Sequence, residues 1–410
     1  MKENILLKQY IDLSTLTVYR GVLESKPVDT LYRLFGEIAK GNADPGELCG
    51  MYATVYYELA KQDAGTLEES ITPFLKFNVS PYARAAACGE GEDRLAKAAH
   101  RDLDILSALC ALPCSVIKSS IDNVCGFQAS SGLPDWKTSE KPIDFDALTV
   151  FHRINGYGIF AKSHAFVWEN GALRAIKNPD TINVENMVGF EWQREQVINN
   201  TRALCKGNRV NNILLYGDSG TGKSATVKSM VNIPEFYNLR IIELPKDHLS
   251  EIPDVLRLVS GHQQKFVFFI DDLSFENNEE VFSSLKIVLE GGLEMRPQNV
   301  VIYATSNRRH LVREYFNERK GTLSTDAEEE VHANETVQEK ISLSERFGIK
   351  IPYMALNKKE FINLVQELAK QENIPMSEDE LSARAIEWES HYPGRTPRTA
   401  HQFIDYLKTL

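Results

Sequence analysis

The feature that most constrains this sequence is a glycine-rich stretch at residues 217–224, which matches the pattern G-x-x-x-x-G-K-S/T. The apolar residues 213–216 precede it and a helix-forming run follows it, so a buried strand, a tight loop and a helix are predicted in that order. Such a loop turns consecutive backbone N–H groups inward at a helix N-terminus, where they bind phosphate oxygens. This context favours a phosphate-binding loop in an α/β fold over a chance glycine-rich turn.

Each residue type in this loop has an expected role. The glycines allow the backbone to curl around a β-phosphate, Lys223 is expected to bridge the β- and γ-phosphates, and the Ser224 hydroxyl is expected to ligate Mg²⁺. ATP and Mg²⁺ are therefore the predicted ligands. The predicted nucleotide-binding residues are Gly217, Asp218, Ser219, Gly220, Thr221, Gly222, Lys223 and Ser224.

A pair of carboxylates follows a second apolar run. Residues 266–270 are wholly apolar and end in Asp271 and Asp272, so a buried strand is expected to carry both side chains to its C-terminal end. We expect Asp271 to hold Mg²⁺ through water, and Asp272 to orient or activate an attacking water. Two alternatives stay open: the pair caps the next loop, or Glu276 is the base in place of Asp272.

Three further polar side chains are candidates for the same site. Asn307 follows the apolar run 300–304 and is expected to lie between the Asp pair and a γ-phosphate, although asparagine is also common in turns. Arg346 follows an acidic stretch at 317–340, predicted to be a solvated loop, and Arg398 lies in the first turn of the final predicted helix. A guanidinium near a γ-phosphate stabilises transition-state charge. Each arginine could equally form a surface salt bridge.

Strand-like and helix-like segments alternate between residues 191 and 304, which predicts a parallel sheet with ligands at the C-terminal ends of its strands. Residues 1–145 show helix-like apolar spacing and are expected to form a mainly helical N-terminal domain. Short β-like runs punctuated by Asn-Gly pairs predict a small β-meander and linker at 146–185. The expected strands are 213–216, 240–244, 266–270 and 300–304, and the expected helices are 191–206, 223–232, 248–260 and 280–290.

Composition excludes several classes of protein. The 410 residues are 43% apolar and 25% charged, as in ordinary globular chains. The N-terminus lacks a signal-peptide pattern, and the longest apolar stretch, near 103–117, contains Asp104 and Pro113, so a cytoplasmic protein without a membrane span is expected. The net charge of −11 is spread over both halves, so charge does not indicate nucleic acid as a partner, although a local patch could still bind it. The six cysteines include no C-x-x-C pair and favour buried apolar roles over a zinc site.

Taken in order, these motifs resemble those of the AAA+ superfamily over residues 186–410. The resemblance implies that 217–224 is the Walker A motif and that the run ending in Asp271 and Asp272 is the Walker B motif. It implies that Asn307 is sensor 1, that Arg346 is an arginine finger acting in trans, and that Arg398 is sensor 2 in a helical lid. The segment 188–193, which holds Val188, Gly189, Phe190, Glu191 and Gln193, is similar to the one that lines the adenine pocket.

More narrowly, the segments 211–224, 270–276, 288–311 and 342–348 are similar to those of a DUF815-like family of bacterial AAA+ ATPases, in which helices and a β-segment precede the core. The resemblance implies a P-loop NTPase sheet, with an α/β core at 186–351 and a helical lid at 352–410. Two departures matter. Asp272 replaces the usual Walker B glutamate, and the segment 245–249 lacks the aromatic-apolar-glycine loop of threading unfoldases, which disfavours an unfolding pore.

Three functions are consistent with these patterns. The first is an ATPase that hydrolyses ATP to remodel or load a partner macromolecule, acting as a homo-oligomer on an unidentified client. The second is a nucleotide-dependent, oligomerising switch or scaffold with little turnover. The third is a P-loop small-molecule kinase, against which Asn307, Arg346 and the helical lid argue.

Overall fold

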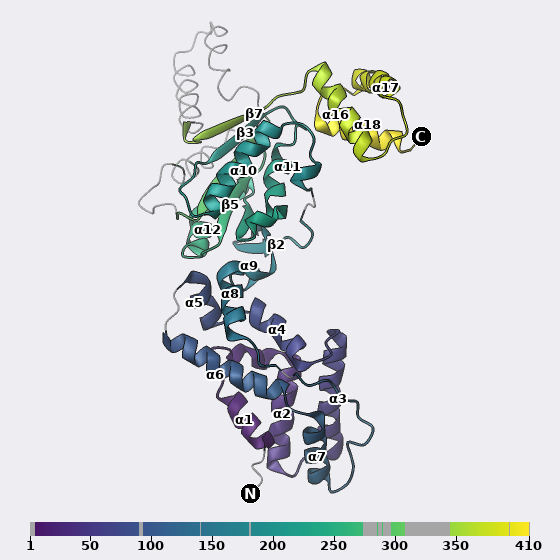
Figure 1. Cartoon of the computed structure of the whole chain (residues 1–410). Helices are drawn as coiled ribbons and strands as arrows, with labels where there is room; N and C mark the ends of the chain where they lie inside the picture. Colours follow the sequence, from purple (N-terminus) through teal and green to yellow (C-terminus); the bar gives the residue numbers. More distant parts are fainter. Residues whose placement is uncertain are drawn as a thin grey trace. The chain divides into compact units, whose positions relative to one another are not determined.

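The computed structural model describes residues 5–89, 93–139, 141–179, 182–273, 285, 289, 297–307, 345–392 and 394–409. Backbone contacts divide the chain into two compact units, Met1–Lys162 and Ser163–Leu410 (Figure 1). The predicted boundaries after residues 145 and 185 differ from this single division.

The described part of the first unit is helical, as the sequence predicts for residues 1–145. Helix α2 ends at Gly41, which adopts φ +73°, and α3 begins after Asp44, whose side chain accepts the Glu47 N–H. Leu34, Phe35 and Tyr52 are fully buried between these helices. The elements are α1 (Ile5–Ser14), η1 (Arg20–Glu24), α2 (Lys26–Lys40), α3 (Pro45–Lys61), α4 (Leu67–Phe77), α5 (Pro81–Cys88), α6 (Asp93–Cys110), α7 (Cys114–Cys125), α8 (Phe145–Asn155) and α9 (Ile159–Lys162).

Among the described residues, no single helix is long and apolar enough to cross a membrane, and the pair α6 and α7, bent by 73°, meets the length and composition criteria only when taken together.

The predicted β-meander is wrong in its first half. Residues 145–155 form α8, because Asp144 caps the helix by accepting the Ala147 N–H at 2.9 Å, and because Leu148 and His152, one turn apart, are both buried. Gly156, which was expected in a hairpin turn, instead caps the helix C-terminus. The second predicted hairpin is confirmed at β1 (Ala165–Glu169) and β2 (Ala172–Ala175).

The second unit contains a seven-stranded sheet in the order β2-β1-β4-β5-β6-β3-β7. Every neighbouring pair is parallel except β1 with β2, and β1 pairs with β4, so the hairpin extends the same sheet rather than forming a separate meander. The predicted α/β class is thereby confirmed. The remaining strands are β3 (Ile213–Gly217), β4 (Leu239–Glu243), β5 (Lys265–Ile270), β6 (Val300–Ser306) and β7 (Ile349–Tyr353).

Helices pack against this sheet, and further helices come after its last strand in the sequence (Figure 1). Val267, Phe269 and Tyr303 are fully buried in one core cluster of the sheet, where each large apolar side chain contributes about 1.5–3 kcal/mol. After β7 the chain forms three helices with their own core, which corresponds to the predicted lid. The predicted helix 280–290 and the predicted loop 317–340 lie outside the described residues, apart from Leu285 and Leu289. The helices are α10 (Glu191–Cys205), α11 (Lys223–Lys228), α12 (Ile252–Val259), α16 (Lys358–Gln371), α17 (Glu378–His391) and α18 (Pro397–Leu407), with 3-10 turns at Val184–Asn186, Ser229–Asn232, Pro234–Phe236 and Lys246–Glu251.

Strand β7 is absent from the strands predicted from the sequence. It contains Pro352 and pairs with β3 alone, at the edge of the sheet. A proline is tolerated there because an edge strand needs hydrogen bonds on one side only. The strand matters for the site because its last residue, Tyr353, lies opposite Gly217.

Candidate nucleotide-binding site

The predicted phosphate-binding loop begins where β3 ends beside β7. Gly217 adopts φ +132°, and a Cβ on it would lie 2.2 Å from the carbonyl oxygen of Tyr353, so only glycine fits. The Asp218 N–H donates to that same oxygen at 2.8 Å, and the Asp218 carboxylate accepts the Ala355 N–H at 2.6 Å. The loop is therefore anchored to β7, a strand that lies beside β3 in the sheet but is far from the loop in the sequence.

Lys223 is folded back onto this loop. Its side chain is 5% exposed, and its ammonium donates to the carbonyl oxygens of Gly217 at 3.1 Å and Asp218 at 2.6 Å. Burial lowers the pKa of Lys223 to about 8, since desolvation disfavours the charged form. An ammonium held by two neutral carbonyls is well suited to exchange them for phosphate oxygens, which carry full negative charge.

Asp271 and Ser224 meet at the start of α11. The Ser224 hydroxyl donates to Oδ1 of Asp271 at 2.5 Å, the Thr305 hydroxyl donates to the same oxygen at 2.6 Å, and Lys228 Nζ lies 3.7 Å from Oδ2. Hydroxyl and carboxylate oxygens are the ligands that Mg²⁺ prefers. Among the described residues, no group of three or more His, Cys, Asp or Glu side chains is arranged to hold a metal ion.

Asp272 lies beside this pair in a left-handed conformation, with φ +52°. Its N–H donates to the Thr305 hydroxyl at 2.8 Å, its Oδ1 accepts the Asn307 amide at 2.6 Å, and its Oδ2 lies 3.3 Å from Lys246 Nζ. Asn307 thus contacts Asp272 of the predicted pair, and its expected place between the pair and a γ-phosphate stays a prediction. The sequence analysis did not identify Thr305 or Lys246 as site residues. Thr305 lies near the end of β6 and Lys246 follows β4, and these two strands flank β5.

Lys223, Ser224, Asp271, Asp272 and Asn307 line one cavity of about 820 Å³, whereas Gly217 and Asp218 of the predicted loop do not. The lid contributes to it, because the Arg398 N–H donates to the Gly220 carbonyl oxygen at 3.2 Å and the Arg398 side chain lines the cavity. Glu276 lies outside the described residues. The lining residues are Ile182, Asn183, Asn186, Met187, Val188, Gly189, Phe190, Arg194, Ser219, Gly220, Thr221, Gly222, Lys223, Ser224, Ala225, Thr226, Asp271, Asp272, Asn307, Tyr353, Pro397, Arg398, His401 and Asp405.

Arg346 is not brought to this cavity. It is exposed and precedes β7, whose other end, Tyr353, adjoins the phosphate-binding loop. At ~3.3 Å per residue, the strand alone separates Arg346 from the loop by more than about 13 Å. Arg346 therefore lies near the N-terminal ends of β3 and β7, whereas its own chain's phosphate-binding loop lies at their C-terminal ends.

One end of the cavity is apolar and suits a nucleotide base. The Phe190 ring stacks on Tyr353 with centroids 5.1 Å apart, and the Tyr353 hydroxyl lies 3.0 Å from Thr226 Oγ1 on α11. Of the segment expected to line an adenine pocket, Val188, Gly189 and Phe190 do line the cavity, whereas Glu191 and Gln193 do not. The cavity thus has the two ends that a nucleoside triphosphate needs.

The parallel sheet, the phosphate-binding loop, the carboxylate pair and the C-terminal helices together define a P-loop nucleotide-binding domain of the AAA+ class. The family comparison is more specific. A family model described as "Protein of unknown function (DUF815)" matches residues 161–409, and the chain belongs to this family.

None of the curated proteins compared with the chain matches it. Similar solved structures include the Thermotoga maritima RuvB Holliday junction branch migration motor, with 18% identity and a TM-score of 0.36 over 55% of this chain and 63% of that chain. A mutant of RuvB has 19% identity and a TM-score of 0.36 over the same shares. The match therefore spans less than two thirds of the RuvB chain.

Proposed function

We propose that this chain is an ATPase that binds ATP with Mg²⁺ in the 820 Å³ cavity and hydrolyses it to ADP and phosphate. The observation that carries the proposal is the meeting of Lys223, Ser224, Asp271, Asp272 and Asn307, from separate strands and loops, in one cavity. A structural role alone would not require two carboxylates, a buried ammonium and an amide at the same strand ends.

Each of these groups has a chemical task at that position. The loop N–H groups and Lys223 bind the phosphates, and Ser224 and Asp271 would hold Mg²⁺, which supplies neutralisation of phosphate charge when bound. The Asp272 carboxylate orients an attacking water and takes up its proton, while the Asn307 amide fixes the carboxylate through Oδ1. Arg398 adds a cation from the lid side of the cavity.

We also propose that the protein assembles with itself and acts on a client macromolecule. An exposed Arg346, at the end of β7 away from the phosphate-binding loop, supports a homo-oligomer in which this arginine serves a neighbour's nucleotide. The ATPase cycle would then remodel or load a client macromolecule in the cytoplasm.

A second candidate function is an oligomerising switch or scaffold with little turnover. One observation favours it: both oxygens of the Asp272 carboxylate already have partners, Asn307 and Lys246. A carboxylate held in this way is less free to act on water. The side chain is also one methylene shorter than the glutamate found at this position in the AAA+ pattern.

Steady-state phosphate release and calorimetric ATP titration separate these functions. Lys223→Ala should abolish tight ATP·Mg²⁺ binding, because the loop loses its buried cation; wild-type affinity in this variant would contradict the nucleotide site. An ATPase should release phosphate well above the background rate of Lys223→Ala. A switch should bind ATP and assemble, with turnover no higher than that background rate.

A further inference from the structure

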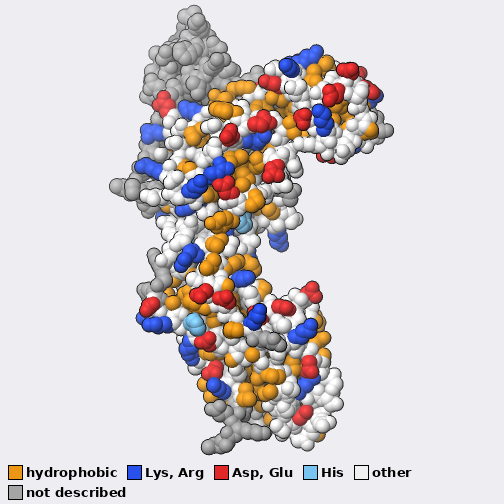
Figure 2. All heavy atoms as spheres, in the orientation of Figure 1, with side chains coloured by type: hydrophobic (Ala, Val, Ile, Leu, Met, Phe, Trp, Pro, Cys, Tyr) orange, Lys and Arg blue, Asp and Glu red, His pale blue; other side chains and the backbone are white. Residues whose placement is uncertain are grey.

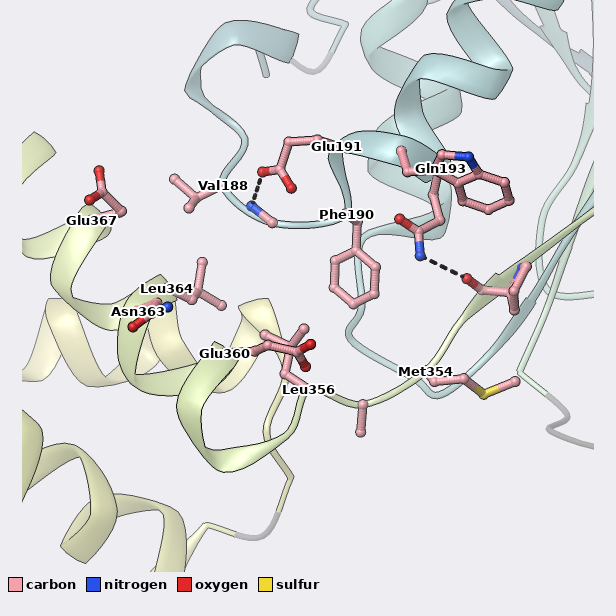
Figure 3. A pocket seen from close by; sticks show the side chains of 14 residues that line it. Val188, Phe190, Glu191, Gln193, Met354, Leu356, Glu360, Asn363, Leu364 and Glu367 are labelled. Carbon is pink, nitrogen blue, oxygen red and sulfur yellow. Dashed lines mark hydrogen bonds between the residues drawn. The ribbon is translucent and has the colours of Figure 1, made fainter.

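A second cavity, of about 540 Å³, lies between the segment 188–193, the end of β7 and helix α16 (Figure 3). Figure 3 shows the Phe190 ring projecting from that segment into the space above Leu356 and Glu360. The nucleotide proposal does not use this cavity. Its lining residues are Val188, Gly189, Phe190, Glu191, Trp192, Gln193, Pro352, Met354, Ala355, Leu356, Glu360, Asn363, Leu364 and Glu367.

The cavity combines apolar walls with negative charge. Phe190, Leu356 and Leu364 form its apolar part, and large apolar side chains at its edge stay exposed, with Trp192 at 56% and Met354 at 41%. On the face drawn in Figure 2, hydrophobic side chains gather between the sheet and the lid helices, with acidic side chains beside them. Exposed aromatic and methionine side chains around a cavity are typical of protein-binding surfaces, and the carboxylates add a preference for a basic partner.

The charge of the lining has one sign. Its fourteen residues include Glu191, Glu360 and Glu367 but neither lysine nor arginine. Glu191 accepts the Gly189 N–H at 2.7 Å and pairs with Arg194 at 3.4 Å, and Glu360 accepts the Asn357 N–H at 2.8 Å, so both are fixed in place. Among the residues that the structure describes, Glu367 pairs with Lys370 alone, at 3.7 Å and exposed, and it is the carboxylate most available to a ligand.

We propose that this cavity binds a peptide segment of a partner protein, in which an apolar side chain stands beside a lysine or arginine. The apolar side chain enters between Phe190 and Leu364, and the cation pairs with Glu367. The exposed Asn363 amide offers a donor and an acceptor to the peptide backbone. Phosphate-bearing partners are repelled, because the lining supplies three carboxylates and no cation to meet them.

The cavity shares a wall with the nucleotide site. Val188, Gly189 and Phe190 line both cavities, and Phe190 stacks on Tyr353, whose hydroxyl lies beside Thr226 in α11. A peptide that holds Phe190 in place therefore acts on the base end of the nucleotide site, and the coupling is reciprocal. This coupling rests on the proposed function, whereas peptide binding does not.

Selection from a displayed library of random nine-residue peptides, on the full-length protein, tests the binding. Enriched peptides should carry leucine, phenylalanine or tryptophan next to lysine or arginine. Their affinity should fall at least about tenfold in Glu367→Lys, because the cation then meets a like charge. Trp192→Ala should weaken them similarly. Enrichment of acidic peptides, or no enrichment, overturns the proposal.

Two matched controls separate the cavity from general effects. Glu378 also pairs with Lys370, at 3.5 Å, and lies outside the cavity, so Glu378→Lys should leave peptide affinity unchanged. Tyr237 is as exposed as Trp192, at 55%, and also lies outside, so Tyr237→Ala should leave it unchanged as well. Equal losses in the variants and their controls would place the peptide elsewhere and overturn the proposal.

ATP titrations with and without a saturating selected peptide test the coupling. The affinity should change by about fivefold or more in the wild type. Lys223→Ala should still bind the peptide as the wild type does, while losing ATP. Peptide binding without any change in ATP affinity overturns the coupling alone. Peptide binding by a wild type that binds no ATP overturns the proposed function and leaves the peptide site standing.

Discussion

Asn307 donates its side-chain amide to Oδ1 of Asp272 at 2.6 Å, and this hydrogen bond joins the ends of the neighbouring strands β6 and β5. The contact fixes one carboxylate oxygen at the mouth of the phosphate-binding loop. It also leaves Oδ2 facing Lys246, at 3.3 Å. The position of Asp272, rather than its residue type alone, makes it the candidate base.

Replacing Asp272 with Asn should therefore lower kcat by about 10²–10⁴-fold, because the amide cannot take up a proton from water. ATP affinity should stay near that of the wild type, since the change acts on the transition state more than on the ground state. Phosphate release and calorimetry measure the two effects. Glu276→Gln is the comparison variant: normal turnover in Asp272→Asn together with loss in Glu276→Gln would assign the base to Glu276.

The pKa of Lys223 gives a second prediction. Burial lowers it to about 8 in the protein without nucleotide, and bound phosphates raise it by favouring the charged form. ATP affinity should then be constant below pH 8 and fall as pH rises above it, approaching about tenfold per pH unit. Titration calorimetry from pH 7 to 9.5 measures this fall, and buffers of different ionisation enthalpy should reveal proton uptake on binding.

Adenosine is the control ligand for this experiment. Because it lacks phosphates, its affinity should not depend on the protonation of Lys223. A pH-independent ATP affinity over the same range would show that Lys223 stays charged without nucleotide.

The backbone of Gly217 gives a third prediction. Gly217→Ala should destabilise the protein by more than ~3 kcal/mol and abolish ATP binding, because φ +132° is strained for alanine and the new Cβ would overlap the Tyr353 carbonyl oxygen. Gly207 also has a positive φ, +84°, but a Cβ added there would meet no other atom within 4 Å, so Gly207→Ala should cost only about 1–2 kcal/mol. Thermal unfolding compares the two. If both variants lose the same stability, the close approach of Gly217 to β7 does not add to the cost of replacing that glycine.

Local sequence signals predicted much of the site. The phosphate-binding loop and the apolar run before Asp271 are continuous segments whose own residues determine a strand, a turn and a carboxylate. The segment after Asp144 shows how one overlooked signal leads to a wrong prediction, here a β-meander in place of helix α8. Its N-cap and the helical spacing of Leu148 and His152 outweigh the Asn-Gly pair that follows, which ends a helix instead of turning a hairpin.

Contacts that depend on sheet order were not predictable in the same way. Lys246 faces Asp272 only because β4 is the neighbour of β5, and Thr305 bonds Asp271 only because β6 is the other neighbour. No local pattern states that order. Strand β7 was missed for a related reason: Pro352 argues against a central strand, and only pairing with β3 shows that it lies at an edge.

Arg346 gives the last prediction. Because it is exposed and β7 separates it from its own phosphate-binding loop, it can serve a nucleotide only in a neighbouring subunit. ATP should then promote assembly, and activity per subunit should rise with protein concentration until the oligomer is populated. Arg346→Ala should bind ATP normally and lower kcat by about 10³-fold or more, as expected for loss of a transition-state cation.

Mixing Arg346→Ala with Lys223→Ala subunits tests this arrangement directly, because each variant is inactive alone for a different reason. In a mixed oligomer, an intact phosphate-binding loop from the arginine variant can face an intact Arg346 from the lysine variant, which restores a fraction of the sites. ATPase activity recovered in the mixture, and absent from each variant at the same total concentration, supports action in trans. A mixture that assembles yet stays as inactive as its components would assign Arg346 a structural role instead.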